Sequence, residues 1–362
     1  MIKVVKTIEL TSGMVTAAPI YSENGQLVVG SDVMLTPQLI NHLKFYGVEE
    51  ASIQDHHSGE VHADTGKSNL ISYQDRIRST VEFKHFKKEF LKSIRFLRSH
   101  IDDVANLKDK QEEEALLSEI LSLFHEMDGE SHMLEMLHCI RGIDTSTYAH
   151  CLNVAILCRL MGRWLHYSKE DVDALTLSGL FHDIGKSRIP KSVLMKPEKL
   201  TAEEYSVMKK HSLYGYEMLK PLSLDARIKR VALMHHERSD GSGYPLGLQT
   251  EDIDPFSIIV SIADVYDAMT TDRVYREAIC PFEVIDTFEK EGFSKYNTQY
   301  TTIFLSHIVD TYMNYHVRLS DGSLGQIVLK NKKDLARPTL YLSSKEYLDL
   351  SAHPELYIKE II

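Results

Sequence analysis

Apolar residues recur at spacings of three and four along the segment that follows residue 80. The first stripe consists of Phe83, Phe86, Phe90, Ile94, Leu97, Ile101 and Val104. The second stripe consists of Leu117, Ile120, Leu121, Phe124 and Met127. This spacing is that of one face of a helix, so the pattern predicts a pair of long helices within residues 71–130.

The first stripe also contains the basic run KHFKKEFLKSIR. We interpret this run as the solvated face of the helix, with a nucleic-acid patch as the alternative. A helical pair between two domains is a common place for subunit contacts. If the chain forms a homodimer, we therefore expect the contact at this helical linker.

Short apolar runs separated by turns mark both ends of the chain. Residues 1–70 contain IKVVKTIEL, QLVVG and the helix-like TPQLINHLKFYG, which predicts a small β-rich module with one helix, suited to sensing or regulation. The polar stretch QDHHSGEVHADTGKSN predicts a loop or linker with solvent-exposed histidines. Residues 317–362 alternate and turn through Gly322 and Gly325, which predicts a short β extension.

Between these ends, residues 131–316 read as a series of helices with recognisable starts. Ser168 precedes KED and Thr201 precedes AEE, as in caps whose oxygen satisfies free backbone amides. Asp225 and Asp254 mark two further starts. The fold is therefore expected to be mainly α, with a helical core between two β-containing ends.

Composition narrows the class of partner. The chain has 362 residues and a formal net charge of −11, which argues against binding DNA or RNA polymers. Its apolar runs fall short of the roughly 18 residues of a membrane helix, and no signal-peptide core is evident, so we expect a cytoplasmic protein without a membrane contact. The four cysteines form no CxxC pair or disulfide framework. An anionic substrate then has to be held by metal ions and a few placed cations.

Seven polar side chains lie in or at the ends of the apolar helices. They are His150, His182, Asp183, His211, His235, His236 and Asp264. Taken singly, each is better explained as a hydrogen-bonded core residue or a helix cap. Together, burying them without a counter-ion would leave unpaired groups that cost about 1–3 kcal/mol each. A metal centre would remove that cost.

The types of candidate ligand limit the choice of metal ion. Imidazole and carboxylate without thiolate favour iron, manganese or a similar divalent ion over a structural zinc site. Seven side chains exceed the needs of one tetrahedral ion, so we expect two ions that share a bridging carboxylate. Two ions about 3.5–4 Å apart activate water and hold both the attacking and leaving oxygens of a phosphoryl centre. The expected reaction is hydrolysis of a phosphoester.

Three longer strings carry a family pattern: FHDIGK from Phe181, HHERSDGSGYP from His235 and SIADVYDAMTTDRVYR from Ser261. Together they resemble the HD-GYP family, a branch of the HD-domain phosphohydrolases, over about residues 131–316. The HD pair alone is a weak signal, whereas HHExxDGxGYP followed by DAxTxxRxYR is a strong one. The resemblance implies a helical HD-domain core that hydrolyses the bacterial second messenger cyclic di-GMP.

The resemblance also implies a division of the ligands. One metal is held by His150, His182, Asp183 and Asp264. Asp183 bridges to a second metal, which is held by His211, His235 and His236.

Further roles follow from the same resemblance. Lys186 lies beside the scissile phosphate, where it stabilises charge or protonates the leaving oxygen. Arg273 and Arg276 grip the substrate phosphates, because a guanidinium fork suits two oxygens at once. A surface ion pair is the alternative for these arginines. Tyr244 contacts the nucleotide or shapes the pocket.

Two positions depart from the family pattern. Cys151 stands where the family usually has serine, which we interpret as a change in packing. Ser146, one turn before His150 on the metal-facing side of the predicted helix, stands where members with a third metal carry glutamate. Because a hydroxyl is a poor metal ligand, we expect two metals and no third.

Within HHERSDGSGYP, smaller roles can be assigned. We expect Glu237 to orient a ligand imidazole and Asp240 to be a turn residue. Gly241 and Gly243 would let the chain turn sharply beside the pocket.

The expected function is a metal-dependent phosphodiesterase acting on the 3',5'-phosphodiester bond of a cyclic dinucleotide. The resemblance favours cyclic di-GMP, cleaved to linear pGpG; whether GMP is the end product stays open. Two alternatives stay open: an HD-fold phosphohydrolase for another nucleotide, and a sensor that binds the messenger without cutting it. The complete ligand set together with Lys186 favours catalysis. Docking of a cyclase-domain partner on the GYP loop, the loop that contains Gly243, Tyr244 and Pro245, is also left open.

Overall fold

The computed structural model describes residues 2–11, 13–21, 27–30, 33, 35, 39–40, 43, 48–54, 73–101, 104, 107, 109–127, 132–141, 143–144, 146–271 and 278–362. The chain divides into two compact units, Met1–Leu70 and Ile71–Ile362.

The N-terminal unit contains two small antiparallel sheets. Strand β1 (Ile2–Lys6) pairs with β4 (Glu50–Gln54), and β2 (Ile20–Tyr21) pairs with β3 (Leu27–Val29), while η1 (Thr7–Glu9) follows β1. Its apolar side chains form a core of their own. The predicted strands are therefore present. Most of TPQLINHLKFYG, and all the histidines of the predicted linker, lie outside the described residues.

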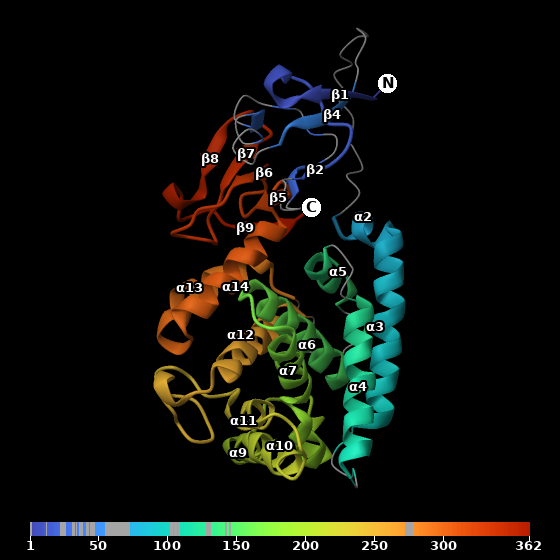
Figure 1. Cartoon of the computed structure of the whole chain (residues 1–362). Coiled ribbons are helices and arrows are strands. Elements are labelled where there is room, and N and C mark those ends of the chain that lie inside the picture. Colours follow the sequence, from blue (N-terminus) through green and yellow to red (C-terminus); the bar gives the residue numbers. More distant parts are fainter. Residues whose placement is uncertain are drawn as a thin grey trace. The chain divides into compact units, whose positions relative to one another are not determined.

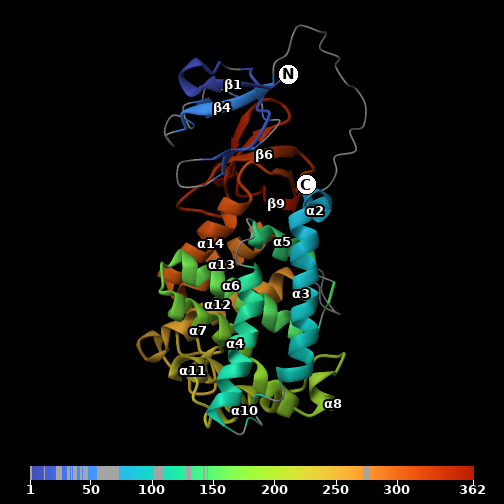
Figure 2. The ribbon, with the colours of Figure 1, turned by 45° about the vertical axis from the view of Figure 1, so that its right-hand side comes forward.

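The larger unit begins with α2 (Tyr73–Ser79), α3 (Val81–His100) and α4 (Lys110–Met127). Helices α3 and α4 lie side by side, in Figure 1 and again in Figure 2. Thr80 starts α3 by accepting a hydrogen bond from the Phe83 N–H at 3.1 Å. Both predicted stripes face the core. The predicted end of the first helix was wrong, because the stripe was expected to continue to Val104, whereas α3 ends at His100.

The helical core follows in chain order. It comprises α5 (Met133–Ile140), α6 (Thr147–Trp164), α7 (Lys169–Phe181), η3 (Ile184–Arg188), α8 (Lys191–Leu194), α9 (Ala202–Lys209), α10 (His211–Leu219), α11 (Ala226–Met234), η4 (Thr250–Asp252), α12 (Pro255–Thr270), α13 (Pro281–Lys295) and α14 (Thr298–Thr311). The four predicted starts are confirmed, because Ser168, Thr201, Asp225 and Asp254 each accept a hydrogen bond from a backbone N–H of the first turn. Helices α6, α7, α11 and α12 pack on one another and surround the candidate site.

The chain ends in a five-stranded antiparallel sheet. Its strands are β5 (His316–Leu319), β6 (Leu324–Leu329), β7 (Thr339–Leu342), β8 (Tyr347–Asp349) and β9 (Ile358–Ile361), in the order β8-β7-β6-β5-β9, with η5 (Leu350–Ala352) after β8. Val317, Ile327 and Leu340 on its inner face belong to the same apolar core as the helices. The predicted β segment is thus more than an appendage, because it shares the core of the helical unit. Within the described residues, every helix is too short or too polar to cross a bilayer.

Candidate metal centre

Five chain segments bring the seven predicted ligands together. His150 lies in α6 and Asp264 in α12, while His182 ends α7 and is followed by Asp183. The other three are His211, the first residue of α10, and His235 and His236 at the end of α11. They form two groups of candidate ligand atoms, each group with its atoms within 4.8 Å of one another.

The first group consists of His150, His182 and Asp264. Oδ1 of Asp264 lies 3.2 Å from Nε2 of His150 and 4.0 Å from Nε2 of His182. Both imidazoles also face Asp183, whose Oδ2 lies 3.7 Å from Nε2 of His150 and 3.3 Å from Nε2 of His182.

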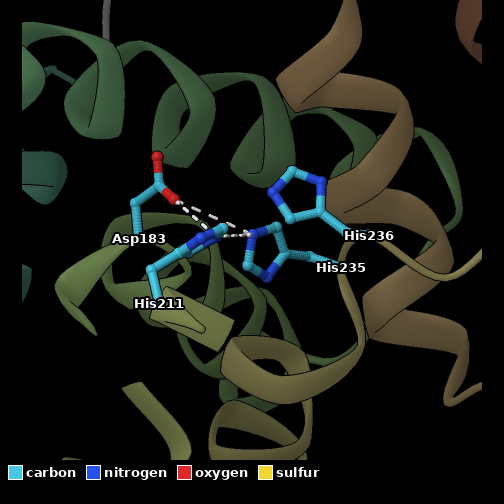
Figure 3. A group of neighbouring side chains, drawn as sticks. All are labelled: Asp183, His211, His235 and His236. Atoms are coloured by element: carbon cyan, nitrogen blue, oxygen red, sulfur yellow. Dashed lines mark hydrogen bonds and ion pairs between the residues drawn. The ribbon is translucent and has the colours of Figure 1, made fainter. Parts of the chain in front are cut away.

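The second group consists of Asp183, His211, His235 and His236 (Figure 3). Oδ1 of Asp183 lies 3.3 Å from Nε2 of His211 and 3.8 Å from Nε2 of His235. The same two nitrogens are 3.3 Å apart. Asp183 therefore presents one carboxylate oxygen to each group, as a bridging ligand does.

In four of these histidines the ring nitrogen Nδ1, which points away from the two groups, is hydrogen-bonded. Nδ1 of His182, His211 and His235 lies 2.7 Å, 2.7 Å and 3.0 Å from the backbone carbonyls of residues 179, 208 and 231 respectively. Nδ1 of His150 lies 2.8 Å from Oδ2 of Asp267. Because carbonyl and carboxylate oxygens only accept, each Nδ1 carries a proton, so a neutral ring presents the lone pair of Nε2 to the two groups. This tautomer is the one that a metal ligand requires.

Two buried polar atoms without a hydrogen-bond partner also indicate a metal centre. Among the described residues, the buried atoms Nε2 of His182 and Oδ1 of Asp183 have no hydrogen-bond partner. Orphaned polar atoms of this kind are rare and costly in a protein interior. A metal ion at each group would satisfy them, so the residues present fit a metal centre.

The protonation states differ between the two groups. Burial lowers the pKa of His211, lowers that of His235 further and brings the pKa of His236 to about 3, so the second group holds neutral imidazoles. Burial would also lower the pKa of His150, but the carboxylates of Asp264 and Asp267 raise it to about 9.

Lys186 lies one turn after Asp183 and contacts it directly. Its ammonium donates a hydrogen bond to Oδ2 of Asp183 at 2.5 Å. Burial would raise the pKa of Asp183, but Lys186 and His182 hold it well below its usual range. Burial likewise opposes the charge of Lys186, but Asp183 raises the pKa of this lysine above its ordinary value. Both groups are therefore charged at neutral pH.

Asp267 is a candidate functional residue that the sequence reasoning missed. Its carboxylate accepts from His150, from Nδ2 of Asn153 at 3.0 Å, and lies 3.4 Å from the guanidinium of Arg141. The signal was present in SIADVYD, because spacing of three places Asp267 on the same side of α12 as Asp264.

The GYP loop follows the second group directly. The ring of Tyr244 stacks on His236, with centroids 4.6 Å apart and an angle of 30° between the planes. Asp240 is a turn residue, as expected, and accepts from the N–H and hydroxyl of Ser242. Gly241 has φ +76°, and a Cβ at Gly243 would lie 2.4 Å from Cα of Glu237, so both positions need glycine.

Glu237 has a different role from the one that the sequence predicted. Its carboxylate was expected to orient an imidazole, but it accepts from the backbone N–H groups of Leu246, Gly247 and Leu248 at 2.7, 3.2 and 2.9 Å. A buried carboxylate needs several donors, and the returning loop supplies them. Glu237 thus holds the GYP loop.

Ser146 also differs from expectation. It is the N-cap of α6 rather than part of the helix, and its hydroxyl accepts a hydrogen bond from the Ala149 N–H at 3.3 Å. Cys151 is a free, buried cysteine, consistent with a packing role. Arg273 and Arg276 lie outside the described residues.

Comparisons with known proteins identify the domain that carries these residues. The HD domain family matches residues 115–299, just over half of the chain. A cyclic di-GMP phosphodiesterase of Pseudomonas aeruginosa is 34% identical over 196 residues, which cover 54% of this chain and 47% of the relative. The cyclic di-GMP phosphodiesterase response regulator RpfG of Xanthomonas campestris is 36% identical over 194 residues, 51% of each chain.

A third relative has a different named substrate. The 3'3'-cGAMP-specific phosphodiesterase 1 of Vibrio cholerae is 41% identical over 145 residues, which cover 40% of this chain and 34% of the relative. The chain thus spans about half the length, or less, of these curated relatives.

A helical core that turns five histidines and two aspartates toward two adjoining groups belongs to the HD class of folds. The chain belongs to the HD domain family and, through HHERSDGSGYP and DAMTTDRVYR, to its HD-GYP branch.

Proposed function

We propose that this chain is a metal-dependent phosphodiesterase that hydrolyses the 3',5'-phosphodiester bond of cyclic di-GMP to linear pGpG, with GMP as the alternative end product. The observation that carries the proposal is the division of Asp183, with one oxygen toward each of two histidine groups. The names of the relatives support a cyclic dinucleotide as the substrate class.

The proposal assigns two divalent ions, iron or manganese, to the two groups. Their ligands would be His150, His182, Asp183 and Asp264 for one ion, and Asp183, His211, His235 and His236 for the other. When bound, such ions polarise phosphoryl oxygens and make water a stronger nucleophile at neutral pH.

The chain's own residues supply position and charge. Lys186, protonated beside Asp183, can stabilise negative charge on the phosphate or donate a proton to the leaving oxygen. Water adds to phosphorus while the bond from phosphorus to the 3' oxygen breaks, which yields a 5'-phosphate and a free 3' hydroxyl. Arg273 and Arg276 would hold phosphate oxygens, and Tyr244 would border the substrate.

Partners and regulation also belong to the proposal. A homodimer would form through residues 71–130, and residues 1–70 would act as a sensory or regulatory module. A cyclase domain is the partner class proposed for the GYP loop. We place the chain in the cytoplasm, where cyclic dinucleotides act.

Incubation of the purified full chain with cyclic di-GMP tests the activity. The protein is loaded with Mn²⁺ or, without oxygen, with Fe²⁺, and products are separated by chromatography. Cyclic di-AMP and 3'3'-cGAMP serve as competing substrates. We expect pGpG from cyclic di-GMP and no product after chelation. A metal-loaded chain that binds cyclic di-GMP and leaves it intact would instead be a sensor.

A further inference from the structure

A lysine and two tyrosines lie together beside the second ligand group. Tyr205 and Lys209 belong to α9, and Tyr244 belongs to the GYP loop. Nζ of Lys209 lies 5.4 Å from the ring centroid of Tyr205 and 5.7 Å from that of Tyr244. The two rings meet edge to face, with centroids 6.5 Å apart and planes at 79°. The ammonium therefore sits between two aromatic faces.

The aromatic rings extend from the candidate ligands toward solvent. Tyr244 stacks on His236, and its ring centroid is 6.4 Å from that of His211. Tyr205 lies farther out and is 48% exposed, although it is a large apolar side chain. An exposed aromatic ring next to a catalytic centre offers a flat face on which a nucleobase can stack.

Lys209 provides an uncompensated positive charge at the same place. Its side chain is half-buried, and within the described part of the chain no carboxylate forms an ion pair with it. Glu204, in the same helix, is paired with Lys196, whose Nζ lies 2.6 Å from its carboxylate. In a chain with a net charge of −11, a half-buried lysine without an acid partner is a local attractor for phosphate.

We propose that Tyr205 and Lys209 form a subsite for the half of a cyclic dinucleotide that is not being cleaved. The inference rests on the proposed function. A cyclic dinucleotide carries two phosphates and two bases, and only one phosphate can lie at the ligand groups. Lys209 pairs with the second phosphate, and the ring of Tyr205 stacks on the adjacent base.

A purely structural role for the same contacts is the competing explanation. Lys209 would then only hold α9 against the GYP loop through its cation–π contacts with the two rings. That role would affect His236 and metal binding, and it would affect every substrate alike. The subsite would affect only substrates with a second phosphate and a base.

Steady-state kinetics on the metal-loaded full chain distinguish the proposed subsite from a purely structural role. The substrates are cyclic di-GMP and methyl 4-nitrophenyl phosphate, which has one phosphate and no base. The variants are Tyr205→Ala, Tyr205→Phe and Lys209→Gln. Lys210→Gln alters the adjacent exposed lysine, and Tyr347→Ala removes a ring that is 52% exposed on β8, so these two are matched controls.

We expect Tyr205→Ala to raise the KM for cyclic di-GMP roughly fivefold to a hundredfold, with kcat little changed, as for loss of one stacked base. Tyr205→Phe should retain most of the affinity. Lys209→Gln should raise KM about tenfold at low salt, and less as salt screens the charge. The small diester should show no change in KM.

Two results would overturn the subsite while leaving the proposed function intact. One is an unchanged KM for cyclic di-GMP in both Tyr205→Ala and Lys209→Gln. The other is an equal change for both substrates together with loss of metal. A wild-type chain that hydrolyses the small diester but no cyclic dinucleotide would overturn the proposed function and the subsite with it.

Discussion

Asp267 accepts a hydrogen bond from Nδ1 of His150 at 2.8 Å, although 117 residues separate the two in the chain. The contact fixes the orientation of the imidazole and directs Nε2 toward Asp183 and Asp264. Carboxylates that hold a ligand histidine in this way increase its basicity and limit its rotation. Asp267 is therefore a positioning residue for the first ligand group.

We predict that Asp267→Asn weakens metal binding at the first group by roughly tenfold to a hundredfold. Asparagine keeps the size of the side chain but loses the charge that favours the Nδ1–H tautomer. Titration against a chelating dye measures the affinity. Asp321→Asn, in an exposed turn, is the control. Equal affinities for Asp267→Asn and the wild type would show that Asp267 does not position His150.

Asp183→Ala should remove both metals and activity together, because this carboxylate faces both groups. We expect two ions per wild-type chain by elemental analysis, fewer than one in the variant, and a fall in turnover of more than about a hundredfold. Asp240→Ala, in the turn of the GYP loop, should keep its two ions. Two ions in Asp183→Ala, or three in the wild type, would contradict the binuclear assignment.

His236→Ala should affect the second group alone. His236 belongs to the group of Asp183, His211 and His235, whereas the first group consists of His150, His182 and Asp264. We expect one tightly bound ion to remain, with turnover reduced by at least about tenfold. Anomalous scattering locates the ion that stays. Full occupancy at the second group would make His236 a structural residue.

Metal binding should release about one proton per chain near pH 7.5. The carboxylates of Asp264 and Asp267 outweigh burial and raise the pKa of His150 to about 9, so the metal-free imidazole is protonated and has to lose that proton to bind. The pKa of His236, about 3, and the lowered pKa of His211 mean that the second group releases none.

Affinity at the first group should consequently fall as the pH is lowered below about 9, by roughly tenfold per unit, while the second group changes little near neutral pH. Isothermal titration in buffers of different ionisation enthalpy counts the released protons. A binding heat that is independent of the buffer would contradict the prediction.

Arg273→Ala should raise the KM for cyclic di-GMP by roughly tenfold to a hundredfold, as expected for loss of a charge-assisted phosphate contact worth about 1.5–3 kcal/mol. Metal content should stay at the wild-type value, which elemental analysis can verify. Lys345→Ala, at an exposed turn of the C-terminal sheet, is a control for loss of a surface cation. Unchanged kinetics would favour a surface ion pair for Arg273.

The sequence alone was sufficient to predict the features that depend on residues close together in the chain. The stripe from Phe83 to Leu97, the caps at Ser168 and Thr201 and the seven candidate ligands could be predicted because helix periodicity, capping and short motifs act within a few residues. The helical core and its candidate chemistry followed from these local signals.

Only the tertiary structure decided how those side chains are oriented and which residues hold them in place. Which oxygen of Asp183 faces which histidines, the contact of Asp267 with His150, and the grip of Glu237 on the GYP loop depend on how α6, α7, α11 and α12 pack. Tyr205 and Lys209 meet Tyr244 for the same reason. Contacts between residues far apart in the chain are set by the packing of whole helices, which no local pattern specifies.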